Sequence, residues 1–150
     1  AGMAARSEII DAFSQDKRYF NTFGGSPVAC TAGHAVLQVI ESENLQENAR
    51  VMGGYMTASL RKLADRFECI GDIRGRGLFV GVDLVCDRES KAPATALANK
   101  IVNGLKDRGV LTCAIGPHEN ILKLRPPMVI TQDNIDYMLG IFEETLSSLC

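Results

Sequence analysis

The stretch "IGDIRGRGLFVGVDLV", residues 70–85, separates long helical patterns and has a different period from them. Its second half, Leu78 to Val85, is a mostly apolar run bounded by glycine, which predicts a β-strand. Gly75 and Gly77 precede this strand, where glycine permits a sharp turn. Because these glycines precede the strand and lack the G-x-G-x-x-G spacing, they do not indicate a dinucleotide-binding turn. The stretch therefore adds a sheet to an otherwise helical N-terminal half.

Three helical patterns come before this strand. Apolar residues recur at helical spacing over residues 6–14, 27–43 and 46–67. Gly53 and Gly54 lie inside the third pattern, where each glycine disfavours a helix by roughly 1 kcal/mol relative to alanine. A helix that keeps two such residues is expected to pack closely against a neighbour, or to kink, at that point.

A helix and two strands follow, and then a last helix. Residues 94–107 predict an amphipathic helix that stops at Gly109. Residues 110–113 and the alternating "ILKLR" of residues 121–125 predict short strands, and apolar spacing from Ile135 to Leu149 predicts the closing helix. This order predicts an α/β (α+β) layer, a small sheet covered by helices on one side.

Composition narrows the class of protein. The chain has 150 residues, the size of one domain, with 46% apolar and 23% charged residues, which is typical of globular proteins. A net charge of −2 disfavours nucleic acid and anionic membranes as partners, and no apolar run approaches the roughly 20 residues of a membrane helix. Five scattered cysteines without a C-x-x-C pair indicate a cytoplasmic protein, and two distant histidines predict no metal site.

Two short stretches have the chemistry to bind an anion. In Gly24-Gly25-Ser26-Pro27, the glycines let a ligand approach the backbone, Ser26 is placed as the N-cap and Pro27 as the first helical residue. The N-terminus of a helix offers unpaired N–H groups, and Thr22 adds a hydroxyl. The same residues also suit a helix start that binds nothing, and the sequence leaves both interpretations open.

The second stretch is "ILKLR", in which Lys123 and Arg125 share one strand face about 7 Å apart. Two neighbouring cations can bind a carboxylate or a phosphate, but they can equally form a solvated face. Residue chemistry alone identifies no nucleophile, no general base and no complete active site.

Three segments together resemble the class-III aminotransferases, pyridoxal-phosphate enzymes of fold type I. They are "YFNTFGGSPVACTAGHAVLQVIE" (19–41), "DIRGRGLFVGVDLV" (72–85) and "GPHENILKLRPPMVIT" (116–131). The resemblance covers essentially the whole chain and corresponds to the C-terminal part of the family. It implies that residues 1–27 are the tail of the large cofactor-binding domain, 28–67 are connecting helices, and 68–150 form the C-terminal small domain.

The resemblance also implies how the cofactor is bound. In the family, the threonine of a T-[FY]-G-G motif contacts the phosphate of pyridoxal phosphate held by the neighbouring subunit of a homodimer. Thr22, Phe23, Gly24 and Gly25 match this motif, and Ser26 stands where many members have asparagine. The lysine that forms the Schiff base lies upstream of the matching segment. The chain, which opens "AGMAARSEIIDAF", is therefore expected to be an inactive fragment without a catalytic residue of its own.

The activity implied for the parent enzyme is amino transfer between an amine or amino acid and a keto acid. Lys123 stands where many amino-acid transaminases of the family carry an arginine for the substrate carboxylate, and the nearest arginine is Arg125. Lys123 and Arg125 are thus implied to bind substrate. The pattern looks more like the branch of phospho-lyases that act on ethanolamine phosphate or phosphohydroxylysine. Two alternatives therefore remain, a phospho-lyase and a non-catalytic binding module.

Overall fold

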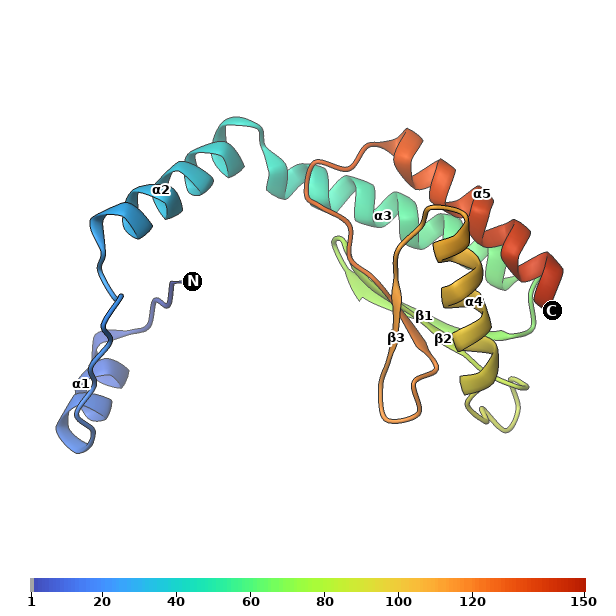
Figure 1. Cartoon of the computed structure of the whole chain (residues 1–150), viewed down its shortest axis with the longest axis horizontal. Coiled ribbons are helices and arrows are strands. Elements are labelled where there is room, and N and C mark those ends of the chain that lie inside the picture. The colour runs from blue at the N-terminus through green and yellow to red at the C-terminus, as the bar shows by residue number, and fades with distance from the viewer. Residues whose placement is uncertain (1) are drawn as a thin grey trace. The chain divides into compact units, whose positions relative to one another are not determined.

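A computed structural model describes residues 2–150 (Figure 1). The chain divides after Glu43 into two compact units. Its elements, in chain order, are α1 (Ser7–Asp16), α2 (Pro27–Ser42), α3 (Leu45–Ala64), β1 (Ile70–Arg76), β2 (Phe79–Leu84), α4 (Thr95–Asp107), β3 (Cys113–Ile115), β4 (Ile121–Leu124) and α5 (Gln132–Leu149). No helix within residues 2–150 has both the length and the apolar character needed to cross a membrane.

The first unit contains α1 and α2, and neither helix has a buried residue. Helix α2 begins at Pro27 with Ser26 as its N-cap, as the sequence predicted. The Ser26 hydroxyl, however, makes no capping hydrogen bond, so proline and not serine chemistry marks this helix start. Many apolar side chains of this unit are exposed, including Phe13, Phe20 and Phe23.

The second unit is built on an antiparallel sheet with strand order β1-β2-β4-β3. Along β2, the side chains of Val80, Val82 and Leu84 are buried while those between them are not. The buried side chains of α3, α4 and α5 form a single core cluster with this face of the sheet. The sequence prediction of a small sheet covered by helices on one side is therefore confirmed.

Strand β1 was missed by the sequence analysis, which predicted a turn at Gly75 and Gly77, whereas Gly75 lies in β1 and only Gly77 lies in the turn. Residues Ile70–Arg76 instead pair with β2 in a hairpin, and the turn lies at Gly77, where φ is +53°. A bulge between Ile70 and Asp72 shifts the register of this pair. Because a bulge breaks the alternation of buried and exposed residues, β1 lacks the period that identifies a strand.

The predicted strand at residues 110–113 was wrong by a few residues. The backbone N–H groups of Gly109 and Val110 still donate to carbonyls in the last turn of α4, those of Lys106 and Leu105. Gly109 stops the helix as predicted, with φ at +86°. Because Val110 is still hydrogen-bonded to the end of α4, pairing with β4 starts only at Cys113.

Helix α3 belongs to the compact unit that contains the sheet, because the chain divides after Glu43. Its buried residues include Gly53, Met56 and Leu60. A Cβ atom placed on Gly53 would lie 2.1 Å from the carbonyl oxygen of Gly77, whereas one on Gly54 would meet nothing within 4 Å. The close packing predicted from the two glycines is therefore present at the first of them only.

We expect the substitution Gly53→Ala to lower the free energy of unfolding by about 1–3 kcal/mol, because the new methyl group forces α3 away from the β1–β2 turn. The matched control is Gly54→Ala, which adds the same methyl group to the same helix in open space and should stabilise it by up to about 1 kcal/mol. Urea denaturation of both variants measures the difference. Equal effects at the two positions would contradict this packing.

Candidate functional site

The predicted anion-binding loop is folded by Asn21, a residue that the sequence analysis did not single out. The side-chain oxygen of Asn21 accepts hydrogen bonds from the backbone N–H groups of Phe23 and Gly24, each at 3.0 Å. Gly25 follows with φ at +71°, a left-handed conformation that suits glycine. Asparagine commonly folds turns in this way, but its position before T-F-G-G carries no functional signal by itself.

The loop presents hydrogen-bond donors to solvent. Thr22 and the three residues after it are all exposed, and a Cβ on Gly25 would meet no atom within 4 Å. Within residues 2–150, the backbone N–H groups of Val28 and Ala29 have no acceptor. Hydroxyl and free amide donors at the positive end of a helix are the groups that bind phosphate. The residues present here therefore fit the phosphate group of a cofactor.

The second candidate site is a hollow of about 580 Å³ in the second unit, lined by both Lys123 and Arg125. Lys123 is half-buried and lies on the face of β4 opposite to the buried Leu122 and Leu124, as predicted. Arg125 is exposed and follows the strand, which ends at Leu124, so it is not part of the strand as the sequence analysis expected.

The two cations of this hollow have no acidic partner. Among the described residues 2–150, neither Lys123 nor Arg125 forms an ion pair. The remaining lining is largely apolar and includes Met56, Pro127 and Tyr137. An apolar hollow with two free positive charges can bind an anionic small molecule.

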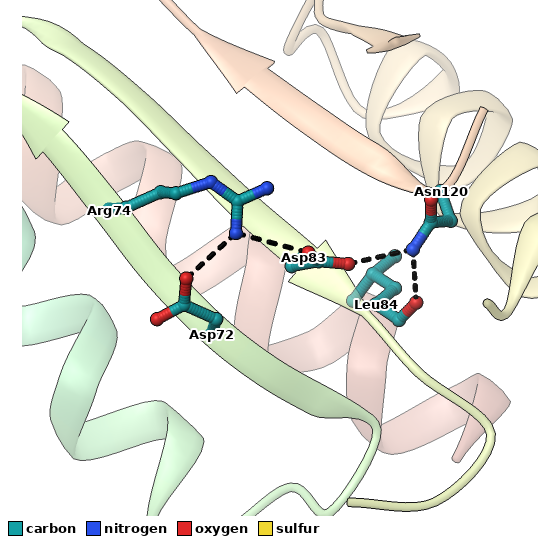
Figure 2. A network of polar contacts seen from close by, with 5 residues as sticks. All are labelled: Asp72, Arg74, Asp83, Leu84 and Asn120. Atoms are coloured by element: carbon teal, nitrogen blue, oxygen red, sulfur yellow. Dashed lines mark hydrogen bonds and ion pairs between the residues drawn. The ribbon is translucent and has the colours of Figure 1, made fainter. Parts of the chain in front are cut away.

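Strand β4 is held in register by Asn120, which is buried and immediately precedes it. The side-chain amide of Asn120 donates to the Asp83 carboxylate at 2.7 Å and to the Leu84 carbonyl at 2.8 Å (Figure 2). In return, the backbone N–H of Leu84 donates to the carbonyl of Asn120 at 2.9 Å. Asn120 therefore joins the start of β4 to the end of β2, and so fixes where Lys123 lies.

The carboxylates of Asp72 on β1 and Asp83 on β2 are already paired. The guanidinium of Arg74 donates to Asp72 at 2.7 Å and to Asp83 at 3.1 Å (Figure 2). These hydrogen bonds, that of Asp72 first, raise the pKa of Arg74 above its ordinary value. Asp83 thus bonds to Arg74 and Asn120 together, and neither acid is free to act as a general base. The sequence gives no sign of this network, because its members come from separate strands.

The model of the family described as "Aminotransferase class-III" matches residues 1–146. The ethanolamine-phosphate phospho-lyase homolog 1 of Caenorhabditis elegans is 47% identical over 148 residues, which are 98% of this chain and 32% of that protein.

Solved structures give the same result. A phospholyase from Arthrobacter in complex with phosphoethanolamine is 40% identical with a TM-score of 0.89, covering 96% of this chain and 34% of that one. An amine transaminase from an uncultivated Pseudomonas species, in its PLP-bound form, is 31% identical with a TM-score of 0.84, covering 96% and 34%. The chain therefore spans about a third of the length of these proteins, of which the Pseudomonas transaminase is described as binding pyridoxal phosphate.

We expect Asn120→Ala to lower the free energy of unfolding by about 1–3 kcal/mol, because it leaves one Asp83 oxygen without its donor and removes one of the two donors to the Leu84 carbonyl. Asn103→Ala is the control, since Asn103 is exposed and its amide donates only to Asn99 of its own helix. Thermal or urea unfolding compares the two variants. A loss at Asn103 as large as that at Asn120 would contradict the role given to Asn120.

Proposed function

The chain belongs to the class-III aminotransferase family, and from this we propose that it is the C-terminal part of an enzyme that transfers an amino group between an amine or amino acid and a keto acid. The observation that carries the proposal is the T-F-G-G loop that leads into α2, where Thr22 is exposed and the Val28 and Ala29 amides are free within residues 2–150. Pyridoxal phosphate, when bound, supplies the electron sink for chemistry at the carbon that bears the amino group.

The role of the loop is to hold the phosphate of this cofactor. The Thr22 hydroxyl and the free amides at the start of α2 would donate to the phosphate oxygens, while Gly25 leaves room for the ligand to approach. We place this contact between two subunits of a homodimer, with residues 1–27 belonging to the large domain. The lysine that carries the cofactor is then supplied upstream, and the chain by itself is expected to be inactive.

Lys123 and Arg125 would bind the anionic end of the substrate. Both line the hollow beside β4 and neither is neutralised by an acid within residues 2–150. The apolar lining around them would exclude water and strengthen the attraction between opposite charges. We propose that the substrates are small amines and keto acids and that the protein works in the cytoplasm, since its scattered cysteines suit a reducing compartment.

A second activity is equally compatible, the elimination of phosphate from a phosphorylated amine of the ethanolamine phosphate type. Lysine is a compact point charge and lacks the planar fork with which arginine binds a carboxylate through two parallel hydrogen bonds. Lys123 therefore favours a substrate anion that does not need this fork, such as a phosphate. Two of the similar proteins, those from Caenorhabditis elegans and Arthrobacter, are named as phospho-lyases.

The loop is tested by Thr22→Val in the full-length protein. Loss of a hydrogen bond to a charged phosphate should raise the Kd for pyridoxal phosphate roughly 10- to 100-fold, measured by spectroscopic titration. Thr31→Val is the control, because the Thr31 hydroxyl donates to the Pro27 carbonyl inside α2. An unchanged Kd for the Thr22 variant would show that the loop does not bind the cofactor.

The reaction is tested by giving the full-length protein ethanolamine phosphate with a keto acid. Amino transfer supports the transaminase, and release of inorganic phosphate supports the phospho-lyase. Neither reaction with any amine, together with no cofactor binding, would instead support a non-catalytic module. In the active case, Lys123→Gln should raise KM for the anionic substrate about tenfold, whereas Lys100→Gln on the exposed surface of α4 should leave KM unchanged.

A further inference from the structure

Two cysteines far apart in the sequence meet at the edge of the second unit. The sulfur atoms of Cys69 and Cys150 lie 2.7 Å apart, although the residues are separated by 81 positions. Cys69 immediately precedes β1, and Cys150 immediately follows α5. The pair lies outside both the T-F-G-G loop and the Lys123 hollow, so the proposed function leaves it unexplained.

Both sulfurs are attached to well-fixed backbone. The carbonyl of Cys69 accepts a hydrogen bond from the Val85 N–H at 2.9 Å. The Arg88 guanidinium donates to the carbonyl of the next residue, Ile70, at 3.1 Å, and to that of Phe67, two positions before Cys69, at 3.2 Å. At the other end, the N–H of Cys150 donates to the carbonyl of the buried Leu146 at 2.8 Å. Backbone hydrogen bonds therefore hold both of the segments that carry the two sulfur atoms.

A small thiol reagent can reach the pair. Cys69 and Cys150 line a hollow of about 600 Å³, and Cys150 is exposed while Cys69 is half-buried. Cys86 lines the same hollow, but its sulfur faces the Pro93 carbonyl at 3.7 Å. All three are free thiols, so the hollow holds one contacting pair and one separate cysteine for comparison.

We propose that Cys69 and Cys150 are an oxidation-responsive pair that a small disulfide, such as oxidised glutathione, converts into an intramolecular disulfide bond. The exposed Cys150 thiolate attacks the glutathione disulfide, breaks its S–S bond and releases one glutathione. Cys69 then loses its proton and displaces the second glutathione. In sum, the two cysteines lose two electrons and two protons, and one glutathione disulfide is reduced to two glutathione thiols.

The order of these two steps follows from the surroundings of the sulfurs. Burial first, and then the hydrogen bond with Cys150, raise the pKa of the Cys69 thiol to about 12. Cys69 is therefore protonated at neutral pH and is a poor first nucleophile. Its place beside Cys150 makes it the resolving cysteine once the mixed disulfide has formed.

The bond would join the start of β1 to the end of α5. It closes a loop of about 80 residues, which restricts the unfolded chain and so stabilises the folded one. We expect the oxidised chain to unfold at a Tm higher by roughly 5 °C or more than the reduced chain, and the gain to disappear on reduction.

The test is to incubate the purified chain with glutathione disulfide, then count free thiols and map the peptides by mass spectrometry. The proposal expects five thiols to fall to three, because two are consumed, with a Cys69–Cys150 linked peptide and the higher Tm. Five remaining thiols, a stable glutathione adduct without a bridge, or a bridge through Cys86 would each overturn it.

Two variants test whether the disulfide forms between Cys69 and Cys150 and does not involve Cys86. Cys150→Ser changes an exposed position and should abolish both the linked peptide and the Tm gain. Cys86→Ser removes a different thiol from the same hollow. On oxidation, this variant should still consume two thiols and show the same increase in Tm. If Cys86→Ser also prevented the bridge, the pairing of Cys69 with Cys150 would be wrong.

Discussion

Val80, Val82 and Leu84 point into a core shared with α3, α4 and α5, and this one-sided burial dictates the chemistry of the opposite face. Because neighbouring residues of a strand face opposite sides, burial of Leu122 and Leu124 turns Lys123 away from the core. A shift of β4 by one residue would bury a charge and expose two leucines. The contacts of Asn120 with β2 oppose that shift, so they position the candidate substrate site.

The two regions with anion-binding chemistry differ in what gives them their positive character. In the T-F-G-G loop it comes from backbone amides and the dipole of α2, and no full charge is needed. In the hollow beside β4 it comes from the two full positive charges of Lys123 and Arg125, neither of which forms an ion pair among residues 2–150.

Local features of the sequence predicted the fold class and most helices, because a residue such as Pro27 or Gly109 acts through its own backbone. Strand β1 was missed because a bulge removes its alternation. The bonds of Asn120 and the contact of Cys69 with Cys150 join residues 36 and more positions apart, which no local pattern encodes. The two cations were singled out because their spacing predicted one shared strand face, although Arg125 lies just past the end of β4. The loop was singled out from its glycines and helix start, and the family resemblance then gave it a ligand.

The meeting of Gly53 with Gly77 also limits how this sequence can change over time. The two backbones touch with no side chain between them. When two side chains meet in a core, growth of one can be offset by shrinkage of the other, but neither of these residues can become smaller. The pair therefore has no compensating exchange available. Divergent relatives that add a side chain at Gly53 would have to move the helix away from the hairpin, whereas at Gly77 the constraint is the positive φ.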